Sequence, residues 1–325
     1  MGKSTAKINS SKPVAQVSLH KRNPHQGKYD FAILTKLCPD LEAFTTKNKY
    51  GTTTIDFANP EAVKLLNKAL LFQHYQLNFW DIPTNYLCPP VPGRADYIHH
   101  IADLLAGNNF GKIPTGNNIT CIDIGTGANC IYPIVGTKTF GWKFIASDID
   151  ECAIKNAQSI VDNNNLNAIT LVHQPKSTDI FYGVITKNQQ VDITMCNPPF
   201  HASEKEAHHG SLRKTKNLSN NKTTDVTLNF GGQANELWCV GGEKQFVKNM
   251  VRQSKNFANN CLWFTTLVSK KDHLPTLYKQ LKTANAIDVR TINMGQGNKQ
   301  SRIVAWTFLT NLEQNDWREK RWKNI

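Results

Sequence analysis

The sequence predicts an α/β protein, with a doubly wound sheet of seven strands that follows a mostly helical N-terminal extension. Three observations support this fold class. From about Ile113 onward, short β-prone runs alternate with helix-like segments, as in sheets wrapped by helices. The last two β-prone runs flank the glycine-containing stretch Gly295–Gly297, which favours a closing antiparallel hairpin. Before residue 111, helix-like stretches and a proline-rich connection predominate.

The elements are expected in the following order. In the extension, helix-like stretches cover Phe31–Cys38, Pro60–Tyr75 and Ala95–Leu105, and a proline-rich connection runs from Cys88 to Pro92. In the sheet, strands are expected near residues 119–124, 143–147, 169–172, 191–196, 261–268, 287–293 and 302–309.

The chain therefore divides into three parts. Residues 1–18 form a basic tail that is expected to be disordered, because it is rich in Ser, Thr and Lys with little apolar content. Residues 19–110 form an N-terminal module, and residues 111–325 form the sheet domain. Within that domain, the polar segment 201–235 is expected to be a flexible loop, and such long insertions are usually functional or disordered.

A glycine turn follows the first strand of the sheet. In Asp123-Ile124-Gly125-Thr126-Gly127, the glycines let the backbone approach a ligand closely. A dinucleotide fingerprint would require a third glycine at position 130, where the chain has Cys130, and this counts against a dehydrogenase.

An acidic residue follows the second strand. Asp148 stands where such residues commonly hold ribose hydroxyls, whereas Asp150 is placed to cap the helix expected over Glu151–Asn163. The alternative for Asp148 is a plain helix cap. Together with the glycine turn, this pattern predicts a nucleoside cofactor.

A second motif, Asn197-Pro198-Pro199-Phe200, follows the fourth strand. Open α/β sheets bind ligands at the carboxyl ends of their strands. The Asn197 side-chain oxygen and the Pro198 carbonyl can each accept a hydrogen from an amino group, and Phe200 offers a face for stacking a base. The alternative is a rigid structural turn. Placed downstream of the glycine turn, the motif predicts an S-adenosylmethionine-dependent methyltransferase that acts on an amino group attached to an sp² carbon.

Six segments resemble the large-subunit ribosomal RNA adenine-N6 methyltransferase F family and, more distantly, its eukaryotic relative that methylates U6 small nuclear RNA. They are Leu19–Phe31, Pro92–His99, Asp123–Ala128, Asn197–Phe200, Asn235–Cys239 and Gly295–Arg302. The resemblance implies a seven-stranded, Rossmann-like methyltransferase fold. It also implies transfer of a methyl group from S-adenosyl-L-methionine to N6 of one adenine in 23S rRNA, adenine 1618.

The resemblance implies roles for single residues. Arg94 is expected at the cofactor carboxylate, a role that the bidentate geometry of arginine also favours. Gly125 is expected at the methionine–ribose region, Asp148 at the ribose, and Ser177 at the cofactor adenine, where the relative has Thr. Asn197 is expected to bridge cofactor and substrate. The full expected set is Asn197, Pro198 and Phe200 for catalysis, with Arg94, Asp123, Gly125, Gly127, Asp148, Ser177 and Asn197 for the cofactor.

The charge distribution favours an RNA partner. The formal net charge is +13, and no acidic residue precedes Asp30. Lys21, Arg22 and Lys28 are therefore expected to contact RNA, within a module (residues 19–110) that binds RNA and covers the cofactor. The expected partner is 23S rRNA or a large-subunit assembly intermediate, and the expected state is a monomer.

The cellular setting is expected to be the cytoplasm. The eight cysteines are scattered without a Cys-x-x-Cys pair, so neither a zinc site nor a disulfide framework is indicated, and no metal is expected. No apolar stretch is long enough for a membrane span, and the first residues lack the apolar core of a secretory signal.

Two other classes of function remain open. A protein glutamine-N5 methyltransferase would use the same Asn-Pro-Pro chemistry, usually with Tyr where this chain has Phe200; the basic N-terminus argues against it. A non-catalytic RNA-binding protein on a methyltransferase scaffold is the other. Intact Gly125, Asp148 and Asn197 argue against that interpretation.

Overall fold

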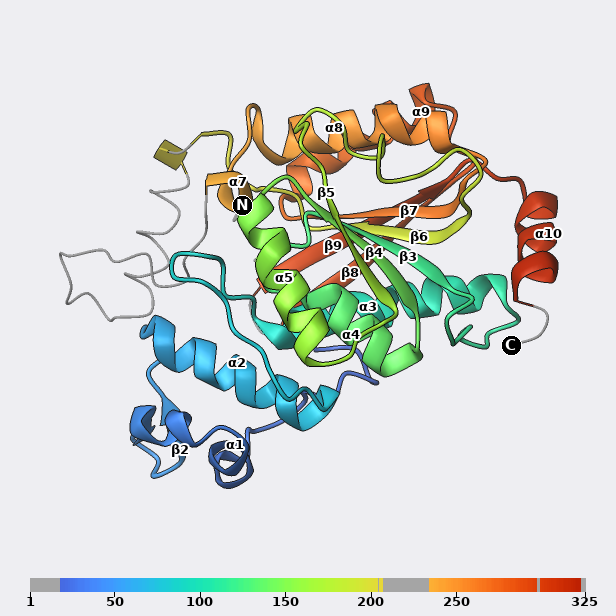
Figure 1. Ribbon diagram of the computed structural model, residues 1–325. Helices are drawn as coiled ribbons and strands as arrows, with labels where there is room; N and C mark the ends of the chain where they lie inside the picture. Colours follow the sequence, from blue (N-terminus) through green and yellow to red (C-terminus); the bar gives the residue numbers. More distant parts are fainter. Residues whose placement is uncertain (1–17, 204, 207–233, 297–298, 323–325) are drawn as a thin grey trace, which may run out of the picture.

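The computed structural model describes residues 18–203, 205–206, 234–296 and 299–322 (Figure 1). A seven-stranded sheet in the order β5-β4-β3-β6-β7-β9-β8 forms its centre. The first five strands in that order are parallel to one another, and β9 runs antiparallel to both β7 and β8. The strands are β3 (Thr120–Ile124), β4 (Lys143–Asp148), β5 (Ile169–His173), β6 (Val191–Cys196), β7 (Cys261–Val268), β8 (Asp288–Gln296) and β9 (Lys299–Thr307). The predicted fold class is confirmed.

Helices cover both faces of the sheet (Figure 1). Side chains alternate along the strands, so Cys121 and Phe144 pack with one set of helices, whereas Ile122 and Ile145 pack with the other. The first set is α3 (Val91–Asn108), α4 (Ile131–Phe140) and α5 (Glu151–Asn163). The second set is α8 (Gly242–Ser254) and α9 (Leu274–Thr283). The short α7 (Ala234–Leu237) precedes α8, and α10 (Asn311–Arg321) follows β9.

The N-terminal extension packs beneath the first set of helices (Figure 1). It contains α1 (Phe31–Leu37), a 3₁₀ helix (Pro39–Phe44), the antiparallel pair β1 (Thr45–Lys47) and β2 (Thr53–Ile55), and α2 (Pro60–Tyr75). Leu34 of α1 and Leu70 of α2 belong to the same buried cluster as Cys121 of β3. The extension and this face of the sheet therefore share one continuous core.

One helix start differs from the sequence expectation. Helix α3 begins at Val91 instead of Ala95, because Pro92 is tolerated in a first turn, where backbone N–H groups have no partner in the helix. Arg94 therefore lies on a helix, half-buried, and is not a surface residue of the connection. Helix α4 begins at Ile131, after Cys130 in a left-handed conformation with φ of 51°.

Several parts of the chain escaped prediction or lie outside the described residues. The β1–β2 pair is too short, and α10 too polar, to give a hydrophobic pattern. The expected tail, apart from Ser18, and residues 204 and 207–233 of the expected loop lie outside the described part of the chain. The ends of the loop are described: His201 forms a parallel bridge with Trp238.

The segment His20–Lys28, here called the strap, is fastened to the first turns of α3. The Asn23 side-chain amide donates to the Pro92 carbonyl (2.9 Å) and to Asp96 (3.2 Å). The backbone N–H of His20 donates to the same Asp96 carboxylate at 2.6 Å. This segment, which carries part of the family resemblance, therefore has a structural role, because it ties the start of the extension to α3.

One carboxylate fastens α10 to the centre of the sheet. Asp192 of β6 is completely buried, and it accepts hydrogen bonds from the indole N–H groups of Trp317 and Trp322 at 2.8 and 2.9 Å. Arg321 donates to both carboxylate oxygens (3.0 and 2.7 Å), and the backbone N–H of Thr120 donates at 2.7 Å. Both tryptophans are therefore part of the fold and are not available for contact with a partner.

We expect Asp192→Ala to lower the free energy of unfolding by about 3–5 kcal/mol, because it leaves the buried guanidinium and indole donors without an acceptor. Urea denaturation monitored by tryptophan fluorescence measures the change. Asp316→Ala, on the exposed side of the same helix, is the matched control and should stay within about 0.5 kcal/mol of wild type. Equal stability of the two variants would mean that Asp192 does not hold α10.

Candidate active site

Strand register brings three polar positions together at one edge of the sheet. Ile124 of β3 pairs with Ser147 of β4 on one side and with Cys196 of β6 on the other. The next residues along these strands are Gly125, Asp148 and Asn197. The three sequence-predicted residues therefore leave the carboxyl edge of the sheet side by side.

A cavity of about 310 Å³ opens at this edge, within the size range of small-molecule sites. Six of the nine residues predicted for catalysis and cofactor binding line it: Arg94, Gly125, Gly127, Asp148, Ser177 and Asn197. Of the other three, Asp123 lies fully buried in the strand just before the glycine turn, Pro198 is buried, and Phe200 is half-buried outside the cavity lining.

The glycine turn is open toward the cavity. Gly125 has φ of 73°, a conformation that L-residues rarely adopt, and no atom lies within 4 Å of where a Cβ would stand. Its N–H and that of Thr126 donate to the Ser147 carbonyl at 2.9 and 3.0 Å, so the turn is held to β4. A ligand can therefore lie directly on the backbone at Gly125.

Asp148 is tied to the same turn. One carboxylate oxygen accepts the N–H of Gly127 at 2.8 Å, and the other accepts the N–H of Asp150 at 3.0 Å. Burial raises the pKa of Asp148, while these N–H donors oppose the rise. The helix cap is Asp150, whose side chain accepts from the N–H groups of Cys152 and Ala153. Asp148 is thus not the cap of α5, and each of its oxygens keeps a lone pair for a hydroxyl in the cavity.

Charged and polar groups meet beneath the turn. The Arg94 guanidinium donates to the Tyr132 hydroxyl at 3.0 Å and lies 5.5 Å from the centre of that ring. Neither carboxylate oxygen of Asp123 has a hydrogen-bond partner among the described residues. Burial raises the pKa of Asp123 to about 7, and the Asp148 carboxylate adds to this rise, whereas the Thr126 hydroxyl and Arg94 oppose it. The Asp123 carboxyl group therefore has room for a hydrogen-bond partner that the described residues do not supply.

The Asn197 motif is supported from behind by α3. The Tyr97 hydroxyl is 2.8 Å from the Thr265 hydroxyl on β7, and it accepts the N–H of Cys196 at 3.5 Å. Asn197 itself is half-buried, and its buried side-chain oxygen has no partner in the described structure. An acceptor without a donor therefore stands in the cavity at the end of β6.

Sequence reasoning missed several lining residues. Tyr132 follows the glycine turn without any pattern that would single it out. Glu236 and Trp238 lie in the segment Asn235–Cys239, which carried a specific resemblance but no assigned role; the Glu236 carboxylate accepts the N–H of Leu87 at 3.0 Å. The family resemblance of Asn235–Cys239 was the sequence signal that could have led to Glu236 and Trp238.

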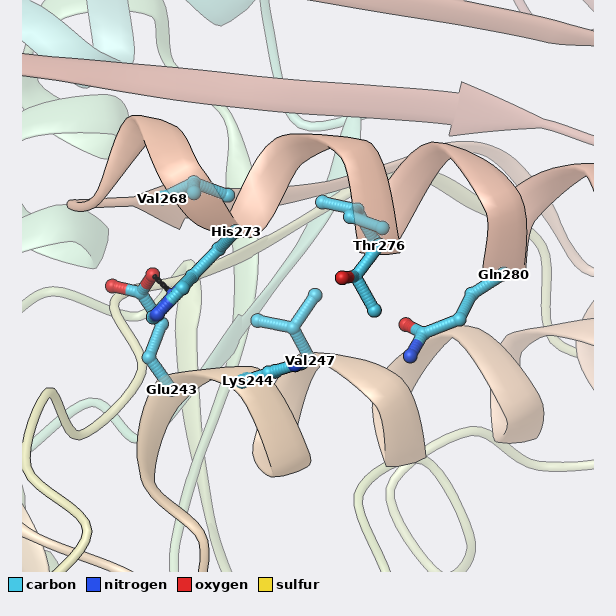
Figure 2. A pocket seen from close by; sticks show the side chains of 8 residues that line it. Glu243, Lys244, Val247, Val268, His273, Thr276 and Gln280 are labelled. Carbon is cyan, nitrogen blue, oxygen red and sulfur yellow. Dashed lines mark hydrogen bonds and ion pairs between the residues drawn. The ribbon is translucent and has the colours of Figure 1, made fainter.

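A second cavity, between α8 and α9, has a volume of only about 10 Å³ and can hold no more than one water (Figure 2). The nearly fully buried carboxylate of Glu243 lines it and pairs with His273 at 2.6 Å. The same carboxylate accepts hydrogen bonds from the backbone N–H of Ser269, at 2.9 Å, and from the Ser269 hydroxyl. Figure 2 shows the Glu243–His273 pair at one end of the cavity. We interpret it as a clamp that fixes the start of α8 to the turn after β7.

The residues predicted to bind RNA differ in their surroundings. Lys21 and Lys28 are exposed. Arg22 is half-buried, pairs with Asp103 at 2.6 Å and donates to the His99 carbonyl at 3.0 Å, so part of its guanidinium serves the fold. Within the described residues, no group of acidic, histidine and cysteine side chains is arranged to hold a metal, and no helix is long and apolar enough to cross a membrane.

Comparison with known proteins identifies the family. A family of RNA methyltransferases matches residues 14–310. The ribosomal RNA large subunit methyltransferase F of Photobacterium profundum is 53% identical over 322 residues, covering 94% of this chain and 95% of the relative. The chain belongs to the ribosomal RNA large subunit methyltransferase F family. The Flavobacterium johnsoniae member is also 53% identical, over 305 residues that cover 93% of this chain and 96% of the relative.

Solved structures agree with this family assignment. The hMettl16 catalytic domain in complex with MAT2A 3'UTR hairpin 1 has a TM-score of 0.76 and 32% identity, covering 90% of this chain and 96% of that one. The N-terminal domain of human METTL16 in complex with SAH has a TM-score of 0.71 and 29% identity, covering 90% of this chain and all of that one. The chain is an RNA methyltransferase, and its cofactor is S-adenosyl-L-methionine, as the sequence predicted. The open backbone at Gly125 and the carboxylate of Asp148 fit such a cofactor.

We propose that Asp148 binds the ribose hydroxyls of the cofactor. Asp148→Asn keeps the size and one acceptor oxygen but removes the charge, and it should weaken binding of S-adenosylmethionine by about 1.5–3 kcal/mol. Calorimetry on the purified protein gives the dissociation constant. Asp150 caps α5, bonds to Tyr86 and lines the same cavity, so Asp150→Asn is the matched control and should change the constant little. The reverse pattern would assign the ribose to Asp150.

Proposed function

We propose that this chain transfers a methyl group from S-adenosyl-L-methionine to the N6 amine of an adenine in 23S rRNA, adenine 1618 by family resemblance. The observation that carries the proposal is the buried, unpartnered oxygen of Asn197 at the end of β6, in the cavity that also contains the glycine turn. A buried acceptor of this kind is costly unless a ligand supplies a donor, and an amino group is such a donor.

The chemistry of the amine explains why an acceptor is needed. The lone pair of an exocyclic amine is delocalised into the ring, so the nitrogen is a weak nucleophile. Hydrogen bonds from its two hydrogens to the Asn197 oxygen and the Pro198 carbonyl would favour a pyramidal nitrogen with a more localised lone pair. When bound, the cofactor supplies an electrophilic methyl carbon on a positively charged sulfur. The amine proton can pass to water afterwards, so this chain needs no general base at Asn197.

The other lining residues suit the rest of the cofactor. Arg94 offers donors for a carboxylate, and the unpartnered carboxylate of Asp123 beneath the turn suits a cationic group. Gly125 and Gly127 allow close approach of the backbone, and Ser177, exposed after β5, is assigned to the cofactor adenine. Phe200 is assigned to stacking against the target base. Because Phe200 does not line the cavity, this contact would form outside the cavity lining.

The basic strap is proposed as part of the RNA-binding surface. Lys21 and Lys28 are exposed at either end of a segment that is fastened to α3, the helix that carries Arg94. An RNA bound there would lie close to the cofactor-facing helix. The related hMettl16 catalytic domain supports this proposal, since its structure is that of a complex with an RNA hairpin.

We expect Asn197→Ala to lower turnover on 23S rRNA by roughly 10²–10³-fold, because it removes one preorganised polar contact from the transition state. The test is mapping of N6-methyladenosine in 23S rRNA from cells that lack the protein and carry wild type or the variant. Affinity for S-adenosylmethionine and the melting temperature serve as controls for binding and folding. Near-normal turnover would remove Asn197 from the mechanism, and wild-type methylation of a protein glutamine in place of RNA would overturn the proposed function.

We expect the double variant Lys21→Ala/Lys28→Ala to flatten the dependence of log affinity for rRNA on log salt by about 0.7–0.9 for each lost phosphate contact. Binding is measured across a salt series with an rRNA fragment. The matched control is Lys138→Ala/Lys143→Ala, because both lysines lie at the opposite edge of the sheet, away from the cavity. An identical slope for both double variants and wild type would remove the strap lysines from the RNA surface.

A further inference from the structure

A single tryptophan in the chain has an indole N–H without a partner among the described residues. Six of the seven tryptophans donate within the protein: Trp80, Trp142, Trp263, Trp306, Trp317 and Trp322, to acceptors 2.7–3.0 Å away. The nitrogen of Trp238 is also buried, yet it has no acceptor in the described part of the chain. Because buried indole groups nearly always find an acceptor, this exception points to a ligand.

Trp238 lines the same cavity as Asn197, and its backbone is fixed relative to the Asn197 motif. His201 pairs with the Trp238 segment through two hydrogen bonds of 3.1 Å, from its N–H to the Leu237 carbonyl and from the Cys239 N–H to its carbonyl. Gly242 packs directly on this pair: a Cβ there would stand 3.1–3.2 Å from the backbone of residues 201–202. The backbone that carries Trp238 is therefore held to the chain that continues from Asn197.

Trp238 and Asn197 thus present one donor and one acceptor, neither with a partner in the described structure. Resting on the proposed function, we propose that the indole N–H of Trp238 donates to a ring nitrogen that flanks the methylated amine of the target base. In adenine, the ring nitrogens N1 and N7 lie on either side of the exocyclic amine, and both are acceptors. The amine faces Asn197, and one of these nitrogens faces Trp238.

This pair of contacts selects the target base. A base with a carbonyl in place of the amine turns an acceptor toward the Asn197 oxygen. The ring nitrogen next to that carbonyl, N1 of guanine or N3 of uracil, carries a hydrogen, so it also turns a donor toward the indole N–H where Trp238 faces that ring position. Each mismatch leaves a buried polar group unpaired, so the mismatched base binds more weakly. Asn197 and Trp238 together therefore favour a base whose amine is flanked by a ring acceptor, as in adenine and cytosine, over guanine and uracil, whereas Asn197 alone would sense only the amine.

The alternative acceptor for Trp238 is the cofactor. The polar groups that we assign to the cofactor follow β3 and β4, at Gly125 and Asp148, or lie on α3 at Arg94. Trp238 is bonded instead through His201 to the chain that continues from the Asn197 motif. This placement favours the base as the acceptor for Trp238. Substrates that each lack one ring nitrogen of the target base show whether Trp238 donates to the base or to the cofactor.

The test combines Trp238→Phe, which keeps the aromatic ring but removes the donor, with RNA substrates altered at the target position. The substrates carry adenosine, 1-deazaadenosine or 7-deazaadenosine, and each analogue lacks one ring acceptor. On adenosine RNA we expect Trp238→Phe to lower kcat/KM by about 10–100-fold, the range for a lost hydrogen bond that leaves its partner buried. For wild type, one of the two analogues should lower kcat/KM by a similar factor. For Trp238→Phe, the same analogue should cause no further loss.

The controls make each outcome decisive. Trp142→Phe removes an indole donor that is bonded to the Pro114 carbonyl, so it should lower the melting temperature and leave the discrimination against the analogue as in wild type. The inference is overturned if each of the two analogues lowers the kcat/KM of Trp238→Phe by the same factor as it lowers that of wild type. It is also overturned if Trp238→Phe loses affinity for S-adenosylhomocysteine by the same factor as it loses activity. Wild type that forms no N6-methyladenosine on the adenosine RNA refutes the proposed function itself, a result distinct from either of these.

Discussion

The site depends on one constraint, the register of three neighbouring parallel strands. Because β3 pairs with β4 and β6 so that Ile124 stands between Ser147 and Cys196, the residues that follow these positions must emerge together. A shift of one residue in either pairing would turn every side chain of that strand to the opposite face. Buried apolar side chains on both faces fix the register, so the same packing that stabilises the sheet also determines the geometry of the site.

Helix α3 connects this edge to the rest of the molecule. Within one turn it presents Arg94 to the cavity, Asp96 to the strap and Tyr97 to the end of β6. These three contacts reach the cofactor side, the proposed RNA-binding segment and the Asn197 motif. A displacement of the strap would therefore shift α3 and, through Tyr97, the backbone next to Asn197. The early start of α3 matters here, since a helix that began at Ala95 would leave Arg94 in a flexible connection.

The sequence predicted features that depend on residues close together in the chain, and it missed features that depend on contacts between distant segments. Gly125 and Asn197 directly follow strands with a clear apolar pattern, and Asp148 ends one, so the sequence pointed to these three positions, and strand order then brings them together. Trp238 and Glu236 could not be assigned, because their places depend on a bridge across the segment that begins after His201. The burial of Trp317 and Trp322 likewise depends on Asp192, more than a hundred residues away in sequence. Alternating aromatic and charged residues on α10 gave no sign of that acceptor.

Buried polar atoms without partners occur in two places in the described structure. Asp123, Thr126, Asn197 and Trp238 surround the glycine turn and the cavity, whereas Arg22, His25 and His99 lie where the strap packs on α3 and α2. Each such atom costs stability, and a protein selected for folding alone would pair or replace it. Their concentration around the cavity argues that the cost is retained for binding. Since the group at the cavity contains both acceptors and donors, its ligands must offer both in return. A nucleoside cofactor and a heterocyclic base with an amino group have that mixed character, which a purely anionic ligand lacks.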